Sequence, residues 1–142
     1  MIYCRYEFAG ETGFGIVEGV NVLGIKGTPF ESYTHSGKSH PLSEVKLLHP
    51  VVPSTFYAIG SNYKSHIIER SKVKGVPPKF YDRPRVGYRA NSALIGTAEQ
   101  IIKPHDSGTE FQYEGELVAV IGKKGRNLTP EQAMECILGW TI

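Results

Sequence analysis

Residues 113–123 read YEGELVAVIGK, and this segment is the most informative part of the chain. Glu114 and Glu116 alternate with apolar residues in a run whose β-branched composition is typical of a buried strand. Alternate residues of a strand point to the same face, so the segment predicts two acidic side chains on one face. Two such carboxylates suit a hard divalent cation with oxygen ligands, such as Mg²⁺. A solvent-facing strand end on which both acids stay hydrated would produce the same pattern.

A second informative segment, residues 60–69, reads GSNYKSHIIE. It follows a short apolar run that predicts a strand, and Ser61 or Asn62 is expected to cap the helix that begins there. His66 and Glu69 are three residues apart in the first turns of that helix, so both side chains can reach one point. A carboxylate beside an imidazole can orient it and raise its basicity, as a general base requires. An ordinary helix-surface histidine beside an acid fits the spacing as well.

Residues 74–91 contain many prolines and glycines, which predicts a long irregular loop. The loop also concentrates aromatic and basic side chains, and loops of this kind are often functional. Arg83, Arg85 and Arg89 could clamp a substrate carboxylate, because guanidinium geometry matches that of a carboxylate. Each of these arginines could equally be a solvated loop charge.

The bulk composition excludes several classes of protein. The chain has 142 residues, enough to bury a core. Its 16 basic and 14 acidic residues give a net charge of +2, far from the basic stripe of a nucleic-acid-binding protein. The N-terminus lacks a secretory pattern and no apolar run approaches membrane-spanning length, so we expect a cytoplasmic protein with no membrane partner. Cys4 and Cys136 form no recognised motif and are expected to be ordinary thiols.

The chain is expected to consist of two parts. Residues 1–25 contain three short strand-like runs, which predict a small antiparallel sheet. Residues 28–41 are rich in Ser, Gly, His and Pro, and residues 42–50 do not decide between strand and short helix. Pro50 and Pro53 then bracket two valines and favour an extended connector. The prediction is therefore a small N-terminal β domain, residues 1–52, followed by a second domain, residues 53–142.

The end of the chain carries a strong helix-start signal. Thr129 and Gln132 have the spacing of a capping box, and Pro130 occupies the first helical position. Gly139 is expected to end this helix, after which residues 140–142 resemble the beginning of a strand.

Taken in order, three segments resemble the fumarylacetoacetate hydrolase family, in particular its 2-hydroxyhepta-2,4-diene-1,7-dioate isomerase and acylpyruvate hydrolase-like members. The segments are AIGSNYKSHIIE at residues 58–69, PRVGYRANSAL at residues 84–94 and YEGELVAVIGKKGRNLTPEQAMECILGWTI at residues 113–142. The resemblance covers nearly everything after Pro53. It implies a β-rich α+β fold in which a small N-terminal β domain precedes the first part of the family's mixed β-sandwich roll, incomplete at the C-terminus.

The same resemblance implies roles for four acidic and histidine residues. The family's NYxxHxxE segment supplies a histidine and a glutamate that activate water, which assigns His66 and Glu69 as the catalytic dyad. Its ExE strand supplies two metal ligands, which assigns Glu114 and Glu116 to a divalent cation, Mg²⁺ or alternatively Mn²⁺ or Ca²⁺.

Substrate binding is expected to involve Arg89, Tyr88 and Arg85. Arg89 stands where the family often has a lysine in an FxKPSSAL-like segment. Family members act on 2-oxo acids and acylpyruvate-like compounds by C–C hydrolysis, decarboxylation or isomerisation. These reactions share the need to stabilise a developing enolate. The resemblance therefore implies a metal-dependent hydrolase, isomerase or decarboxylase of a small 2-oxo acid or acylpyruvate-like dicarboxylate.

The chain departs from the family pattern at its end. It stops at Ile142, before the NDVSxRD-like segment whose aspartate is the family's third metal ligand. We therefore expect one part of a split or truncated enzyme, completed by a C-terminal chain or segment in a homo- or hetero-oligomer. The alternative is a non-catalytic assembly subunit that uses the same scaffold.

Overall fold

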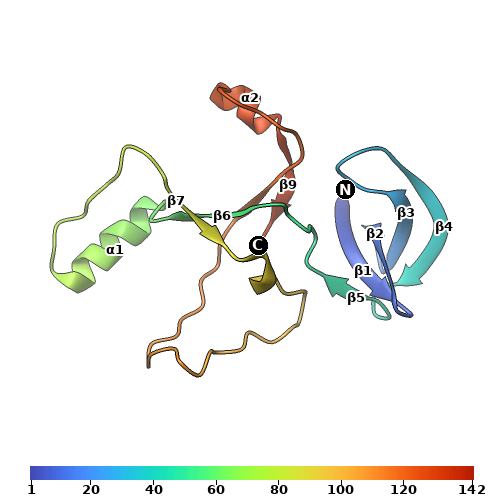
Figure 1. Cartoon of the computed structure of the whole chain (residues 1–142), viewed down its shortest axis with the longest axis horizontal. Helices are drawn as coiled ribbons and strands as arrows, with labels where there is room; N and C mark the ends of the chain where they lie inside the picture. Colours follow the sequence, from blue (N-terminus) through green and yellow to red (C-terminus); the bar gives the residue numbers. More distant parts are fainter. The chain divides into compact units, whose positions relative to one another are not determined.

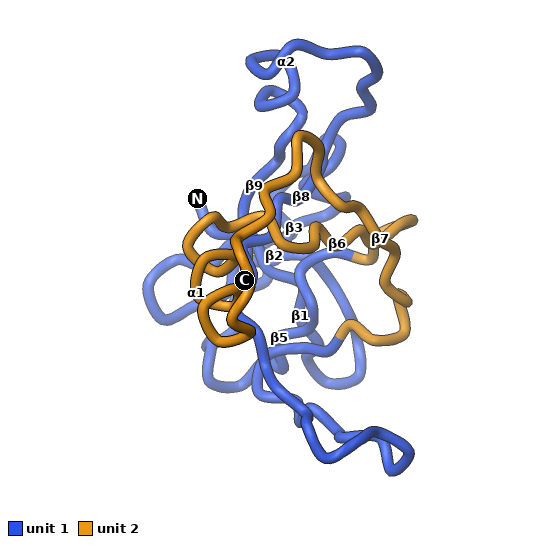
Figure 2. Tube along the Cα trace, turned by 90° about the vertical axis from the view of Figure 1, so that its left-hand side faces the viewer, with its two compact units in different colours: residues 1–51, 95–142 blue, residues 52–94 orange.

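The computed structural model describes all residues, Met1–Ile142. They form two compact units, Met1–Val51 with Ile95–Ile142 and, separately, Val52–Leu94 (Figure 2). The elements in chain order are β1 (Ile2–Phe8), β2 (Glu11–Glu18), β3 (Asn21–Gly27), β4 (Tyr33–Pro41), β5 (Lys46–Leu48), β6 (Phe56–Gly60), α1 (Lys64–Lys74), β7 (Arg85–Arg89), the 3-10 helix η1 (Asn91–Ala93), β8 (Val118–Ile121), α2 (Pro130–Met134) and β9 (Ile137–Thr141). No helix among them has the length and apolarity needed to cross a membrane.

The first unit contains a five-stranded antiparallel sheet of order β4-β3-β2-β1-β5 (Figure 1). Its first three strands confirm the sheet expected for residues 1–25. The sheet is strongly curved, because strands that are not neighbours touch on its concave side. Phe8 of β1 stacks there on His40 of β4, with ring centroids 4.0 Å apart. On the opposite face of the sheet, the hydroxyl oxygens of Tyr3 and Tyr33 are 3.0 Å apart. This curvature lets one layer of strands enclose its own core.

Tyr6 lies at the centre of that core. Its side chain is 7% exposed and clusters with Cys4 and Val22. Two neighbouring glycines make room for the phenol ring: a Cβ at Gly15 would lie 3.1 Å from the ring, and a Cβ at Gly24 would lie 2.9 Å from the hydroxyl oxygen. Burial also raises the pKa of the Cys4 thiol. Glycine in these strand interiors therefore serves the close approach of an aromatic side chain.

Strands β4 and β5 cannot be predicted from the local sequence. The composition of residues 28–41, rich in Ser, Gly, His and Pro, does not indicate a strand, and the spacing of apolar residues in 42–50 fits strand and short helix equally. In the structure, β4 pairs with β3, with a register irregularity near Leu23 and Ile25, and Gly37 takes a φ of 80°. Strand β4 forms because it hydrogen-bonds to β3, and β5 forms because it hydrogen-bonds to β1. These partners are distant in sequence, so the composition of the two segments does not predict them.

A short segment after Leu94 is attached to β5 within the first unit. The Lys46 ammonium lies 2.7 Å from Glu99 Oε1, and Glu99 Oε2 accepts a 2.7 Å hydrogen bond from the Gly96 backbone N–H. A Cβ at Gly96 would lie 2.7 Å from the Leu47 carbonyl oxygen, so only glycine allows this approach. The hydrogen bond from Lys46 lowers the pKa of Glu99, and the same hydrogen bond raises the pKa of Lys46.

The Glu99 attachment should depend on pH. A lowered folded-state pKa means that its contribution to stability is present above the unfolded-state pKa and is lost as the pH falls through the folded-state value. We expect the Gly96 amide resonance, followed by NMR, to titrate with a midpoint below the ordinary glutamate value of 4.5. The titration should disappear in Glu99→Gln and persist in the exposed control Glu44→Gln. A midpoint at or above the ordinary value would contradict the attachment.

The second unit contains the antiparallel pair β6–β7 and helix α1 (Figure 1). The strand expected before Gly60 is confirmed as β6, but the loop expected for residues 74–91 is wrong in part, because it contains β7. The five residues of β7 pair along their whole length with β6, from Phe56↔Arg89 to Gly60↔Arg85. Pairing with β6 therefore overrides the turn-rich composition that surrounds this strand.

Helix α1 begins later than expected. The N-cap is Tyr63, without a side-chain cap hydrogen bond, and the prediction of Ser61 or Asn62 is wrong. Ser61 has a φ of 55°, in the left-handed region, whereas an N-cap needs extended backbone. The helix ends at Gly75, whose φ of 64° is typical of a left-handed C-cap.

The last part of the chain forms α2 and the antiparallel pair β8–β9. The capping box of Thr129 and Gln132 is confirmed, with both of its hydrogen bonds present. The expectation that Gly139 ends the helix is wrong, because α2 ends at Met134 and Gly139 lies inside β9, opposite Val120. The strand therefore begins at Ile137, earlier than residues 140–142 suggested. Pairing with β8 determines this boundary.

Candidate active site

His66 and Glu69 lie on α1 in the second unit. His66 is in the first turn, as expected, and Glu69 follows three residues later, so the two side chains project from neighbouring positions on one side of the helix. Both are exposed, and no hydrogen bond or ion pair joins them. The helix therefore places the two groups within reach of one another and leaves both accessible to a ligand.

Glu114 and Glu116 lie in the first unit, in an exposed segment before β8. Their expected place within a strand is wrong, because β8 begins at Val118. The ladder with β9 starts at the pair Val118↔Thr141, and β9 ends there, so no β9 residue faces the two glutamates. An unpaired segment of backbone has no ladder to hold it as a strand.

Glu114 and Glu116 each offer carboxylate oxygens in an exposed segment. No group of three or more His, Cys, Asp or Glu side chains in the chain is placed to hold a metal ion. Mg²⁺ is commonly bound through one or two carboxylates and keeps several waters, so the chemistry of Glu114 and Glu116 fits a hard divalent cation. Two carboxylates alone would leave most positions around such a cation to other ligands.

The three residues expected to bind substrate do not share one face. Arg85 and Arg89 alternate with Gly87 along β7 and therefore point to the same face, whereas Tyr88 points to the opposite face. There the Tyr88 ring lies against Tyr57 of β6, with centroids 5.2 Å apart. The sequence could have shown this division only if the loop containing these residues had been recognised as a strand.

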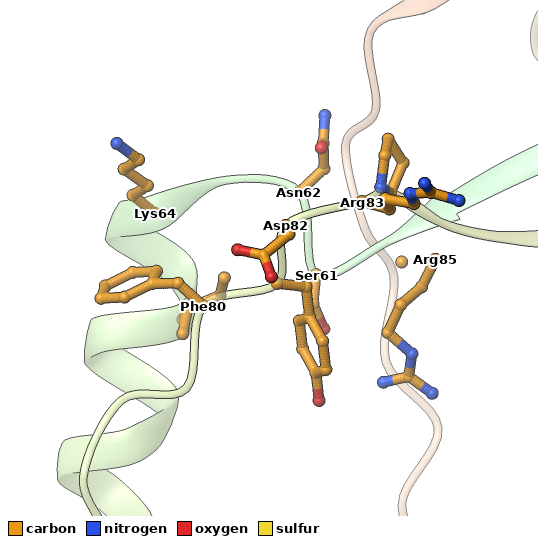
Figure 3. A pocket seen from close by; sticks show the side chains of 11 residues that line it. Ser61, Asn62, Lys64, Phe80, Asp82, Arg83 and Arg85 are labelled. Carbon is orange, nitrogen blue, oxygen red and sulfur yellow. The ribbon is translucent and has the colours of Figure 1, made fainter.

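A cavity of about 230 Å³ lies at the start of α1, entirely within the second unit (Figure 3). Its lining residues come from the turn after β6, the first turn of α1 and the segment before β7, and they are Gly60, Ser61, Asn62, Lys64, Ile67, Phe80, Tyr81, Asp82, Arg83, Pro84 and Arg85. His66 and Glu69 do not line it. With 3.6 residues per turn, they lie on the opposite side of α1 from Lys64 and Ile67.

Sequence reasoning missed Lys64 and Asp82, which gave no motif signal. Tyr81 is one of the aromatic residues of the segment 74–91. In the structure its ring is flanked by two cations, with Lys79 Nζ 5.6 Å and the Arg85 guanidinium carbon 5.5 Å from the ring centroid. These contacts are within the range of cation–π attraction.

The family model described as fumarylacetoacetate (FAA) hydrolase C-terminal matches residues 55–142. The chain belongs to this family. A second model, described as Rv2993c-like, N-terminal, matches residues 1–50. The resemblance seen in the sequence is therefore confirmed, although the domain boundary at residue 52 and the roles of individual site residues stay predictions.

Curated relatives in the FAA hydrolase family match over part of their length. Protein Rv2993c of Mycobacterium tuberculosis is 37% identical over 114 residues, covering 80% of this chain and 40% of the relative. Oxaloacetate tautomerase YisK of Bacillus subtilis is 37% identical, covering 72% of this chain and 34% of the relative. A homoprotocatechuate catabolism bifunctional isomerase/decarboxylase of Escherichia coli is 33% identical, covering 66% and 21%. The chain thus spans less than half the length of each relative.

Solved structures of the FAA hydrolase family share the fold. A 5-carboxymethyl-2-hydroxymuconate delta-isomerase from Mycobacterium smegmatis has a TM-score of 0.82 at 29% identity, covering 99% of this chain and 52% of that chain. A 2-hydroxyhepta-2,4-diene-1,7-dioate isomerase from Mycobacterium marinum has a TM-score of 0.78 at 26% identity, covering 97% and 51%. The β-rich fold of this family is confirmed, and the incompleteness expected at the C-terminus stays a prediction.

Proposed function

We propose that this chain is part of an enzyme that moves a proton next to the carbonyl of a small 2-oxo acid or acylpyruvate-like dicarboxylate. Tautomerisation, isomerisation and decarboxylation of such compounds all pass through an enol or enolate, and the matched relatives are named for these three reactions. The observation that carries the proposal is the match of residues 55–142, which includes both the helix with His66 and Glu69 and the segment with Glu114 and Glu116.

The proposed proton transfer uses the exposed groups of α1. In the active form, Glu69 would accept a hydrogen bond from one ring nitrogen of His66, which would leave the other ring nitrogen free to accept a proton. That nitrogen removes a proton from the carbon beside the carbonyl, and the protonated imidazole then gives this proton to the carbonyl oxygen, which forms the enol and restores neutral His66. In hydrolysis the same nitrogen takes its proton from water. Both steps need only the reach and exposure that the helix provides.

Glu114 and Glu116 would hold the divalent cation, Mg²⁺ or alternatively Mn²⁺ or Ca²⁺. When bound there, such a cation would supply positive charge to the developing enolate oxygen and to the neighbouring carboxylate. The two glutamates themselves anchor the site on the segment that leads into β8, and their exposure leaves room for substrate.

The proposed active form includes further polypeptide. The pairs β6–β7 and β8–β9 are two-stranded, and such pairs are at best marginally stable alone in water. Both carry large exposed side chains, such as Tyr88 at 74% and Trp140 at 54% exposure. Exposed apolar surface of this kind is typical of an interface. We infer that a complementing C-terminal chain or segment covers it, within a homo- or hetero-oligomer.

The test combines the chain with the part of Protein Rv2993c beyond the matched region and measures enol-to-keto conversion of oxaloacetate by ultraviolet absorbance at increasing Mg²⁺. We expect activity from the mixture. In Glu116→Gln the Mg²⁺ concentration for half-maximal activity should rise about tenfold or more, since loss of even an outer-shell partner of a metal costs that much.

The matched control is Glu110→Gln, an exposed glutamate in the same segment, which should leave the Mg²⁺ requirement unchanged. Activity equally sensitive to both substitutions would contradict the metal assignment. Assembly of the two parts without any conversion of oxaloacetate, or of the muconate- and heptadiene-type compounds named for the relatives, would favour the non-catalytic assembly subunit.

A further inference from the structure

One face of the β6–β7 sheet combines two arginines with small residues. Directly opposed residues of an antiparallel pair share a face, as do alternate residues of each strand. By the register of the two strands, the face that includes the two arginines, here called the arginine face, consists of Phe56, Ala58, Gly60, Arg85, Gly87 and Arg89.

The middle of the arginine face consists of small residues, Ala58 and Gly87. A Cβ at Gly87 would meet only Arg89 Nη1, at 3.8 Å, so the Arg89 guanidinium bends back along β7 over this glycine. The same nitrogen donates a hydrogen bond to the Tyr88 carbonyl oxygen at 3.3 Å. A Cβ at Gly60 would meet only Arg85, at 3.8 Å from its carbonyl oxygen and 4.0 Å from its Cβ. No side chain other than the two arginines therefore comes within 4 Å of the position that a Cβ would take at Gly87 or Gly60.

Neither arginine is neutralised. The two ion pairs of the chain are Lys38–Glu11 and Lys46–Glu99, and the arginine face contains no acid. Arg85 lies against the Tyr81 ring, which can orient the guanidinium group without removing its charge. Figure 3 shows Arg85 directed away from Arg83 and Lys64. Two arginines without an acidic partner thus project from one face of the sheet, at opposite ends of β7.

We propose that the arginine face binds a small dianion lying over Gly87, with one carboxylate held by Arg85 and the other by Arg89. Four residues of strand separate the two Cα atoms by about 13 Å, and both side chains are long enough to reach inward from the two ends. Each guanidinium group can donate two parallel hydrogen bonds to a carboxylate. The inference rests on the proposed function, because it assigns the two carboxylates of the dicarboxylate substrate. It removes Tyr88, on the opposite face, from this role.

The test titrates the full chain, without metal, with glutarate and with butyrate, and follows the Gly87 and Gly60 amide resonances by NMR. We expect glutarate to bind about tenfold more tightly than butyrate, because the second carboxylate gains charge-assisted hydrogen bonds. Arg85→Gln and Arg89→Gln should each remove this preference. Arg83→Gln, which removes a nearby cation outside β7, should leave it unchanged.

Two variants of Gly87 test whether the position of the Arg89 guanidinium matters in addition to its charge. Gly87→Ala adds only an ordinary contact with Arg89 and should keep the preference, whereas Gly87→Leu should displace the Arg89 guanidinium and lose it with both charges present. Equal affinity for glutarate and butyrate, or an Arg83→Gln loss as large as that of Arg85→Gln, would overturn the inference. A glutarate preference without oxaloacetate conversion would refute the proposed function alone, and conversion unaffected by either β7 arginine would refute the inference alone.

Discussion

Replacing His66 by alanine should lower kcat of the complemented enzyme by about 10²- to 10⁴-fold, the usual contribution of a positioned general base. The side chain is exposed on α1, which has no buried residue, so its removal leaves no cavity. Stability should therefore change by no more than about 0.5 kcal/mol. The measurement pairs oxaloacetate conversion with circular dichroism and thermal unfolding of the same samples.

The control for this substitution is His35→Ala, which removes another exposed histidine, on β4 in the first unit. It should leave kcat unchanged. Glu69→Gln keeps the size of the side chain and should lower kcat less than His66→Ala does, with little change in KM, because Glu69 acts by orienting the imidazole. An His66→Ala enzyme as active as His35→Ala would remove His66 from the mechanism.

Replacing Tyr6 by alanine should lower the free energy of unfolding of the N-terminal sheet by about 3–5 kcal/mol, the cost of deleting a large buried aromatic ring. Tyr6 is 7% exposed and packs with Cys4 and Val22. The residues that lie against the ring include Gly15 and Gly24, which have no side chains to fill the space left by the ring. Urea unfolding followed by circular dichroism measures the difference, and the midpoint should fall with little change in slope.

The matched control is Tyr113→Ala, the same substitution at a side chain that is 92% exposed, with an expected cost within about 0.5 kcal/mol. Tyr6→Phe keeps the ring, and no hydrogen bond is made by the Tyr6 hydroxyl, so this variant should stay close to the parent. If Tyr6→Ala cost no more than Tyr113→Ala, the core would not depend on this ring.

Local sequence accounts for the features that depend on a few neighbouring residues. The capping box at Thr129, the strand before Gly60 and the helix that carries His66 and Glu69 were all recognised, because backbone hydrogen bonds and side-chain spacing act within one or two turns. Alternating apolar residues likewise predicted the first strands of the N-terminal sheet. The order of family motifs along the chain was enough to indicate the FAA hydrolase family.

Tertiary structure alone decided which segments became strands and which face each side chain occupies. Pairing with β6 converts an apparent loop into β7 and places Arg85 and Arg89 on one face and Tyr88 on the other. Pairing with β8 places Gly139 in a strand, and the end of that ladder at Val118 leaves the acidic segment outside it. Whether a segment forms a strand depends on hydrogen bonds to residues distant in sequence. Which face a side chain occupies depends on the register of the pairing, because a shift of one residue exchanges the two faces. Local composition predicts neither the strands nor their faces.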